Sequence, residues 1–170
     1  MSAAVKSLEI RRLGAGDAAD FRALRLAALK ADPQAFGSTY EAEAGRSLAE
    51  FAERLGSSAV FAAYAGGRPV GMTAFKRRDG ARERHKGFVW GTYVQADRRR
   101  SGVAGALMAA LLEAAAAELE LLTLCVVKEN AAAIALYRKF GFEIYGIEPR
   151  ALKDPGGYAD EVLMVRVLAG

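Results

Sequence analysis

A chain of 170 residues, 52% of them hydrophobic and 26% charged, is long enough to bury a core and predicts one globular domain over residues 1–170. No apolar run approaches a membrane span, and the first residues lack the apolar segment of a signal peptide, so we expect neither. One cysteine and one histidine argue against a disulfide or a bound metal and favour a reducing, cytoplasmic location, while a net charge of +4 suits an anionic ligand.

The first third of the chain predicts a strand followed by two helices. Residues 5–13 alternate between apolar and polar, which is typical of a strand. Residues 17–30 have mostly helical spacing, with Asp17 as the expected cap and Asp32-Pro33 as the end. Residues 34–46 are polar and aromatic and predict a loop.

A second helix is predicted from Ser47 to about Gly56. Ser47 followed by Glu50 forms a capping box, in which each side chain bonds a free backbone N–H at the helix start. Residues 59–65 and 69–76 then flank a Gly-Gly-Arg turn, which indicates a hairpin. A charged turn at 77–86 leads into the next strand, which we place at residues 85–94.

The segment Arg99–Ala104 lies between that strand and a long Ala/Leu-rich helix that begins at Val103. At such a point the turn and the first helical N–H groups converge, and they bind phosphate together with the positive end of the helix dipole. Gly102 and the small Ala104 would let an anion approach the backbone closely. We therefore expect a phosphorylated ligand here.

The last third predicts three strands and a helix. The apolar run 121–127 indicates a strand that is buried on both faces. A helix over residues 130–140 ends at Gly141, and residues 142–147 and 160–168 supply two more strands. The alternation of elements predicts an α/β fold with one mixed sheet and helices on both faces.

Two motifs in this order resemble the GNAT superfamily of N-acetyltransferases over nearly the whole chain. The first is a basic residue, two residues, Gly, one residue and a small residue, and the second is an apolar strand followed by an Asn-Ala-Tyr-Gly-Phe series. They are carried here by Arg99, Gly102 and Ala104, and by Asn130, Ala133, Tyr137 and Gly141-Phe142. The resemblance implies a mostly antiparallel sheet splayed at a V-shaped crevice, acetyl-CoA as donor, and an amine acceptor on a small molecule or a peptide N-terminus.

The same resemblance implies where the donor binds. The pantetheine arm would lie between two splayed strand ends and bond the backbone there, and the pyrophosphate would sit on the N–H groups of residues 99–105. The expected donor-binding residues are Tyr93, Val94, Arg99, Arg100, Ser101, Gly102, Val103, Ala104, Gly105, Asn130 and Ala133. Two alternatives stay open: the arginine run 98–100 as a solvated charge run, and Asn130 as a helix cap, which is compatible with donor contact.

Tyr137 is the candidate general acid. A neutral amine must attack the thioester and a thiolate must leave; an aliphatic ammonium has a pKa of about 10 and a thiol one of about 8.5. A positioned acid therefore assists the departing sulfur. Tyr137 lies seven residues after Asn130, which places both on one helix face. The alternative is a packed aromatic with its hydroxyl at the surface.

Acceptor residues are sought among aromatic and acidic side chains, which suit a cationic amine. The GNAT resemblance implies that the opening through which the acceptor enters, called the mouth below, is lined by the region between the first two helices and by the C-terminal strands. The candidates there are Phe36, Tyr40, Glu41, Glu43, Glu148, Asp160 and Glu161, with plain surface charges as the alternative. No general base is singled out.

The remaining features have plainer interpretations. Cys125 is expected in the core and His85 at the surface. The segment 162–165 is either a dimer interface or edge, or a core strand. Two other functions are compatible with the sequence. The first is a non-catalytic CoA-binding sensor, which would need no acid at Tyr137. The second is a nucleic-acid binder, which the lack of aromatic residues within the basic turn disfavours.

Overall fold

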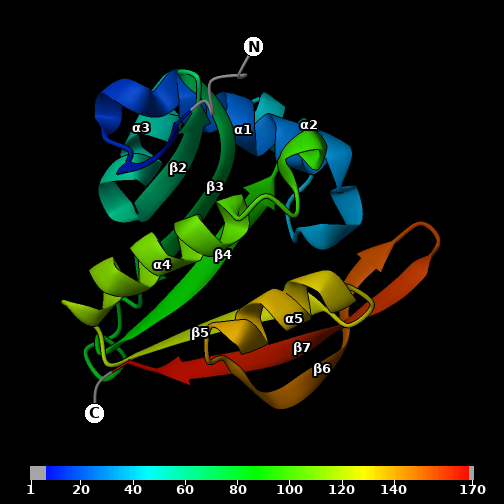
Figure 1. Ribbon diagram of the computed structural model, residues 1–170. Coiled ribbons are helices and arrows are strands. Elements are labelled where there is room, and N and C mark those ends of the chain that lie inside the picture. Colours follow the sequence, from blue (N-terminus) through cyan, green and yellow to red (C-terminus); the bar gives the residue numbers. More distant parts are fainter. Residues whose placement is uncertain (1–6, 169–170) are drawn as a thin grey trace.

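The computed structural model describes residues 7–168 and forms, over that part of the chain, a seven-stranded sheet in the order β1-β2-β3-β4-β5-β7-β6 (Figure 1). The strands are β1 (Leu8–Arg12), β2 (Ala59–Ala65), β3 (Arg68–Arg77), β4 (Lys86–Val94), β5 (Leu121–Val127), β6 (Glu143–Asp154) and β7 (Gly157–Val167). The helices are α1 (Ala18–Ala31), α2 (Tyr40–Ala44), α3 (Leu48–Ser57), α4 (Val103–Ala116) and α5 (Ala131–Lys139), with 3-10 turns η1 (Ala15–Asp17), η2 (Pro33–Ala35) and η3 (Ala96–Arg98).

The sheet opens between its two central strands. All neighbours are antiparallel except β4 and β5, which run parallel and pair only from Lys86 to Phe88 against Leu121 to Thr123. Beyond these residues the two strands diverge, as Figure 1 shows. The predicted mixed, mostly antiparallel sheet with a splayed crevice and helices on both faces is therefore confirmed.

Each face of the sheet has its own core. Helices α4 and α5 cover one face, where Leu107 and Leu111 pack with Leu122 and Tyr137 (Figure 1). Helices α1 and α3 cover the other face over β2, β3 and β4, with Phe21 against Phe51 as an edge-to-face pair at 5.3 Å.

The predicted loop at residues 34–46 is wrong, and two other predictions in the first third hold in part. Residues 34–46 contain the short helices η2 and α2, and Thr39 caps α2 by accepting a hydrogen bond from the Ala42 N–H at 3.2 Å. Asp17 is the N-cap residue of α1, as predicted, but its carboxylate bonds no helical N–H, because it accepts from the Gly14 N–H at 2.8 Å and pairs with Arg11. The first strand is shorter than predicted, and residues 5 and 6 lie outside the described residues. The predicted capping box of Ser47 and Glu50 is present.

The strand β5 is not buried on both faces. Leu122, Leu124 and Val126 are buried, whereas Cys125 between them is exposed. The expectation of a core Cys125 is therefore wrong: its side chain points to the face opposite α4 and α5, which is only partly covered. An apolar run in the sequence cannot distinguish one covered face from two.

The C-terminal hairpin is longer than the sequence predicts. Two register shifts in β6, at Ile144/Gly146 and Glu148/Leu152, break the alternation of apolar and polar residues that marks a strand. Strand β7 pairs with β5 on one side and β6 on the other, so the segment 162–165 is not a sheet edge. Val162 and Met164 belong to the core, and the edge is β6.

Candidate active site

A β-bulge lies in β4 at the point where β4 and β5 separate. Between Met72 and Ala74 the register shifts, so that Gly91 and Thr92 oppose the single residue Thr73. Gly91 has φ +68, and a Cβ there would approach the Met72 side chain to 3.1 Å, so glycine fits this position best. The bulge turns Thr92 toward the face of α4 and α5, where its hydroxyl lies 2.9 Å from the buried Thr73 hydroxyl.

The phenol of Tyr137 reaches the bulge from α5. Asn130 begins this helix as its cap and accepts a hydrogen bond from the Ala133 N–H at 3.2 Å, as the capping alternative predicted. The Tyr137 ring is 8% exposed and packs edge-on against Phe142 at 5.8 Å. Burial raises the pKa of Tyr137, and a hydrogen bond with the Thr92 hydroxyl partly offsets this rise. The phenol is thus protonated at neutral pH and held at the crevice.

The turn before α4 leaves three backbone donors without a helical acceptor. Gly102 has φ +86, and the helical bonds begin with the Ala106 N–H to the Gly102 carbonyl at 3.0 Å. The N–H groups of residues 103–105 thus precede the first helical bond. A Cβ on Gly102 would meet nothing within 4 Å, so the turn has room for a ligand group. This geometry fits the phosphates of a nucleotide-type ligand.

The three arginines beside this turn differ in their contacts. Arg99 donates to the Val94 carbonyl at 3.1 Å and to the Asp32 carboxylate at 2.6 Å, so it ties the turn to the ends of β4 and α1. Arg98 lies 3.8 Å from Asp97. Arg100 has no ion-pair partner within residues 7–168 and has a positive φ of 60°. Of the three, Arg100 carries the charge that is available to a ligand.

Other predicted donor-site residues offer their backbone rather than their side chains. The side chains of Tyr93 and Val103 are buried in the two cores, and Ser101 donates its hydroxyl to the Arg98 carbonyl. Gly105 lies beside the Phe140 ring. Because β4 has no β5 partner beyond Phe88 in the described chain, the β5-facing backbone of its second half is open to a ligand.

Two carboxylates lie on the face of the sheet opposite to Tyr137, on strands β6 and β7. Glu148 and Glu161 are direct cross-strand partners, and neither has an ion pair among the described residues. Burial raises the pKa of Glu161, the nearby Glu148 charge raises it further, and a hydrogen bond with the Cys125 thiol partly offsets this. Asp160 is separate from this pair, since it accepts from the Arg150 N–H at 2.8 Å.

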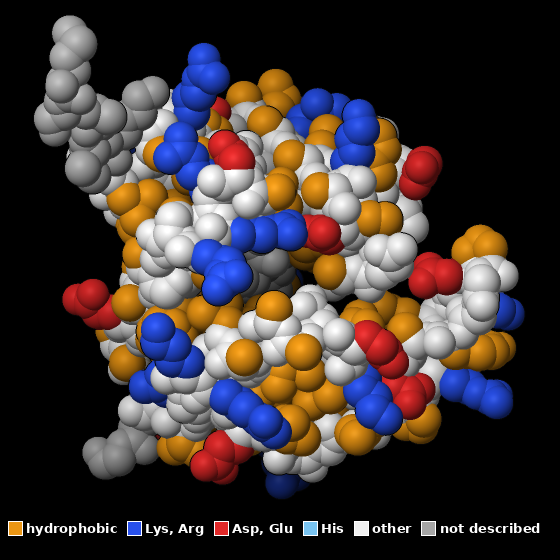
Figure 2. Space-filling model, turned by 45° about the vertical axis from the view of Figure 1, so that its right-hand side comes forward, with side chains coloured by type: hydrophobic (Ala, Val, Ile, Leu, Met, Phe, Trp, Pro, Cys, Tyr) orange, Lys and Arg blue, Asp and Glu red, His pale blue; other side chains and the backbone are white. Residues whose placement is uncertain are grey.

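The loop between α1 and α2 lies near this face. Turn η2 lies against β5, and a Cβ on Gly37 would be 3.9 Å from Leu152 of the C-terminal hairpin. The predicted acceptor residues Tyr40 and Glu41 are exposed on α2, and Phe36 is half-buried. Figure 2 shows the crevice as a hollow across the middle of the molecule, with Lys and Arg side chains along its upper rim.

Glu43 is not part of the mouth. It is buried, accepts hydrogen bonds from Arg54 at 2.6 Å and from the Ser38 hydroxyl, and forms an ion pair with Arg25 at 3.7 Å. Burial alone would raise the pKa of Glu43, but the bond and charge of Arg54, helped by Arg25, outweigh burial and lower it. Both guanidinium groups also lie over the Trp90 ring, at 5.5 and 5.2 Å. Sequence reasoning missed this network, whose one signal is a charged Arg25 on an otherwise apolar helix face.

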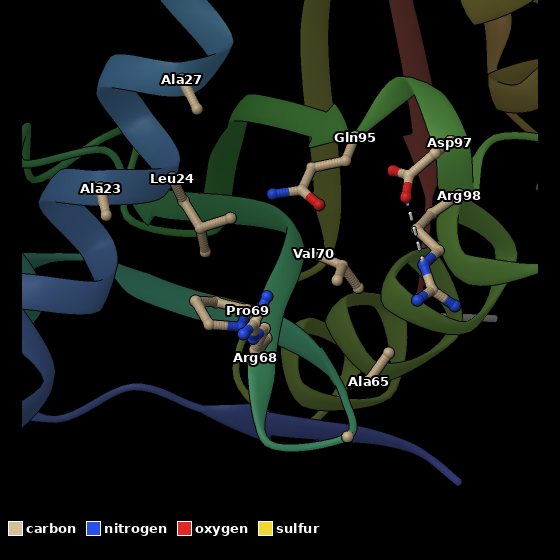
Figure 3. A pocket seen from close by; sticks show the side chains of 11 residues that line it. Ala23, Leu24, Ala27, Ala65, Arg68, Pro69, Val70, Gln95, Asp97 and Arg98 are labelled. Atoms are coloured by element: carbon tan, nitrogen blue, oxygen red, sulfur yellow. Dashed lines mark ion pairs between the residues drawn. The ribbon is translucent and has the colours of Figure 1, made fainter. Parts of the chain in front are cut away.

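Two cavities lie beside the crevice. A cavity of about 670 Å³ lies between α1, the β2–β3 turn and η3, lined by Leu24, Val70, Gln95 and Arg98 among others (Figure 3). Tyr137 and residues 103–105 are not among its lining residues, whereas Gln95, Asp97 and Arg98 of the preceding turn are. A second cavity, of about 490 Å³, lies between the end of α3 and the β3–β4 hairpin.

Comparison with known proteins decides the family. The sequence model of the Acetyltransferase (GNAT) family matches residues 24–142, which is most of the chain. The chain belongs to the GNAT family. Acetyl-CoA is the acetyl donor of this family, and the open turn before α4 fits its phosphates. No curated protein matches the sequence.

Solved structures share the GNAT fold over nearly the whole chain. A GNAT acetyltransferase from Streptococcus pneumoniae is 24% identical with a TM-score of 0.86, covering 96% of this chain and 100% of that one. The ribosomal-protein-alanine N-acetyltransferase from Brucella melitensis is 26% identical with a TM-score of 0.77, covering 94% and 99%. The YncA protein from Salmonella typhimurium, solved with acetyl-CoA, is 20% identical with a TM-score of 0.78, covering 95% and 94%.

For residues 7–168 of this GNAT chain, the structure addresses two questions: whether a helix spans a membrane and whether side chains are grouped to bind a metal. None of the helices there is both long and apolar enough to cross a membrane. The same residues contain no group of His, Cys, Asp and Glu side chains arranged to hold a metal ion.

Proposed function

We propose that residues 1–170 form one catalytic domain that transfers an acetyl group from acetyl-CoA to a primary amine of a small molecule or a peptide N-terminus. One observation carries this proposal. The buried Tyr137 phenol lies on one face of the sheet, and the Glu148–Glu161 pair lies on the other face, on β6 and β7 beside the end of β5. The acid and the amine-binding group are therefore on opposite faces of the sheet, at the end where β5 has separated from β4.

The donor is held from the α4 side. The N–H groups of residues 103–105 and the Arg100 guanidinium bind the pyrophosphate, and the open backbone of β4 around Tyr93 bonds the pantetheine arm. Asn130 and Ala133, at the start of α5, border this arm from the other side of the gap. Arg99 acts indirectly, because its bonds to Val94 and Asp32 fix the turn.

The reacting groups follow from this placement. Bound acetyl-CoA supplies a thioester carbonyl for the amine to attack and a thiolate to leave. Tyr137 donates its proton to the departing sulfur, and Thr92 orients the phenol for that donation. A cationic amine relieves the repulsion between Glu148 and Glu161, and Glu161 then accepts the proton that the amine loses, because its raised pKa makes it a better base than an ordinary carboxylate.

The mouth residues act on the acceptor outside the gap. Phe36, Tyr40 and Glu41 come from the α1–α2 segment, and Asp160 comes from β7 beside Glu161. Together they offer aromatic faces and negative charge to an incoming cation. A reducing, cytoplasmic location, in which Cys125 stays a free thiol, stays a prediction from the sequence.

A homodimer is proposed through β6 rather than β7. Strand β6 is one of the two edge strands of the sheet, and its Ile144, Tyr145 and Ile147 side chains are 40%, 58% and 52% exposed. An exposed apolar edge is a ready template for pairing with a second copy. Sedimentation at micromolar concentration should give the mass of two chains, and Ile147→Lys should give the mass of one; a single-chain mass for the wild type contradicts the dimer.

The experiment that tests the function is thiol release from acetyl-CoA by purified protein over a panel of amines and peptides. Transfer requires release that depends on an amine, with the N-acetyl product seen by mass spectrometry. The CoA-binding sensor predicts tight acetyl-CoA binding without release for any acceptor. A nucleic-acid binder predicts strongly salt-dependent DNA or RNA binding that Gly102→Glu does not change.

A further inference from the structure

The second cavity opens onto the same face of the sheet as the carboxylate pair. Its floor is formed by Phe88 and Trp90 of β4, and its walls by the end of α3 and the β3–β4 hairpin. Phe88 pairs with Thr123 of β5, and Cys125 follows two residues later on the same face. A continuous surface therefore leads from this cavity along β5 toward Glu161.

One charge in the cavity has no partner among the described residues. The other charged groups that line it are compensated: Arg54 by Glu43, Lys76 by Asp79, Arg77 by Glu118 and Glu83 by Lys86. Arg78 alone is left, with its guanidinium 5.1 Å from the centre of the Phe88 ring. An unpaired cation on an aromatic floor binds a carboxylate without first breaking an ion pair.

The far end of the same surface has the opposite charge. Glu148 and Glu161 face each other there without a cation. Cys125 lies between the two ends. Partial burial of its sulfur and the charges of Glu161 and Glu148 together raise the pKa of the thiol to about 11, and Arg78 acts in the opposite direction. The surface thus carries an uncompensated negative end and an uncompensated positive end.

We propose that the acceptor is a peptide whose N-terminal amine binds at Glu161 and whose acidic side chain, a few residues later, binds Arg78. The proposal rests on the proposed N-acetyltransferase function and narrows its acceptor. Val127, the partner of Glu161, is four residues from Thr123, the partner of Phe88, which corresponds to about 13 Å along β5. Strands β4 and β7 lie on opposite sides of β5, about 10 Å apart, so Phe88 and Glu161 are separated by about 16 Å. An extended peptide spans this length in about five residues, so the acid belongs at roughly the fourth to sixth position. A free amino acid is too short to reach both ends.

The test uses seven-residue peptides with a free N-terminus and a neutral background, carrying one Glu, Gln or Lys at each position from the second to the sixth. Thiol release from acetyl-CoA gives kcat/KM for the wild type, for Arg78→Glu and for the control Arg82→Glu. Arg82 is exposed on the same hairpin but does not line the cavity. The wild type should prefer Glu over Gln by about two- to fivefold at the fourth to sixth positions and not at the second, chiefly through KM.

The variants decide the assignment. Arg78→Glu should reverse the preference, so that the Lys peptides become the better substrates, and 0.5 M salt should weaken both preferences. An unchanged preference in Arg78→Glu, an equal effect of Arg82→Glu, or a preference that does not depend on position overturns the peptide assignment. Transfer to small amines alone also overturns it but leaves the N-acetyltransferase standing, whereas no transfer to any amine contradicts the proposed function itself.

Discussion

Tyr137→Phe tests the proposed chemistry most sharply, because it removes one oxygen and keeps the ring. The ring packs against Phe142 and is almost fully buried, so the core stays filled. The lost hydroxyl contacts Thr92, which keeps its contact with Thr73. We therefore expect a stability loss of about 0.5–1.5 kcal/mol, or a few degrees in Tm.

The effect on the rate should be far larger. A positioned acid contributes roughly a hundred- to ten-thousand-fold, so kcat should fall by that factor while acetyl-CoA affinity stays close to the wild-type value. The affinity holds because backbone donors of the turn and of β4 make the donor contacts. The assays are thiol release under conditions where chemistry limits turnover, calorimetry with CoA, and thermal unfolding.

A matched control is Tyr64→Phe. Tyr64 is also buried, but it lies in the core on the α1 side of the sheet, where its hydroxyl bonds Asp20 and Arg11. The Tyr64→Phe variant loses these hydrogen bonds, so its free energy of unfolding should fall while its kcat stays unchanged. A Tyr137→Phe enzyme with near-normal kcat would refute the acid role, and loss of CoA binding in that variant would point to a structural role instead.

Three further predictions follow from the site. Gly102→Glu should abolish CoA binding in calorimetry, because a side chain and a like charge enter the phosphate turn; unchanged affinity would remove the turn from the donor site. In the wild type, kcat/KM should fall as pH drops through the raised pKa of Glu161, and Glu161→Gln should remove this fall. If kcat/KM of the variant still falls at low pH, another group is responsible. Glu43→Gln should cost on the order of 3–5 kcal/mol, because Arg25 and Arg54 lose their buried partner, and its stability gap to the wild type should narrow as pH falls through the lowered pKa of Glu43; a loss under 1 kcal/mol would contradict the network.

The sequence was sufficient for the parts of the site that depend on local chain geometry. The turn at Gly102, the cap at Asn130 and the helical position of Tyr137 follow from short-range rules on glycine, caps and helix periodicity. The splayed sheet was predicted through the family resemblance. These features do not depend on which distant segment packs against them.

The parts that depend on long-range packing were not predictable. Thr92 reaches Tyr137 because a bulge at Gly91 turns it to the other face, and one glycine in a strand does not indicate which way the next side chain points. Cys125 is exposed because only one face of β5 is covered, and the Glu148–Glu161 pair exists through the register of a hairpin with two irregularities. Glu43 was predicted among the acceptor-binding residues, because no pattern in the sequence indicates that Arg25 and Arg54 form ion pairs with it in the fold.

The central claim is that donor and acceptor meet in the gap between β4 and β5, with Tyr137 on one side and Glu161 on the other. A crystal structure of the protein with CoA tests this most directly. We predict that the pyrophosphate lies on the N–H groups of residues 103–105 and that the CoA sulfur lies within hydrogen-bond reach of the Tyr137 hydroxyl. No protein side chain should block the space between the sulfur and the Glu161 carboxylate. A CoA thiol that lies in either cavity, or on the far side of α5 from Tyr137, would contradict the account.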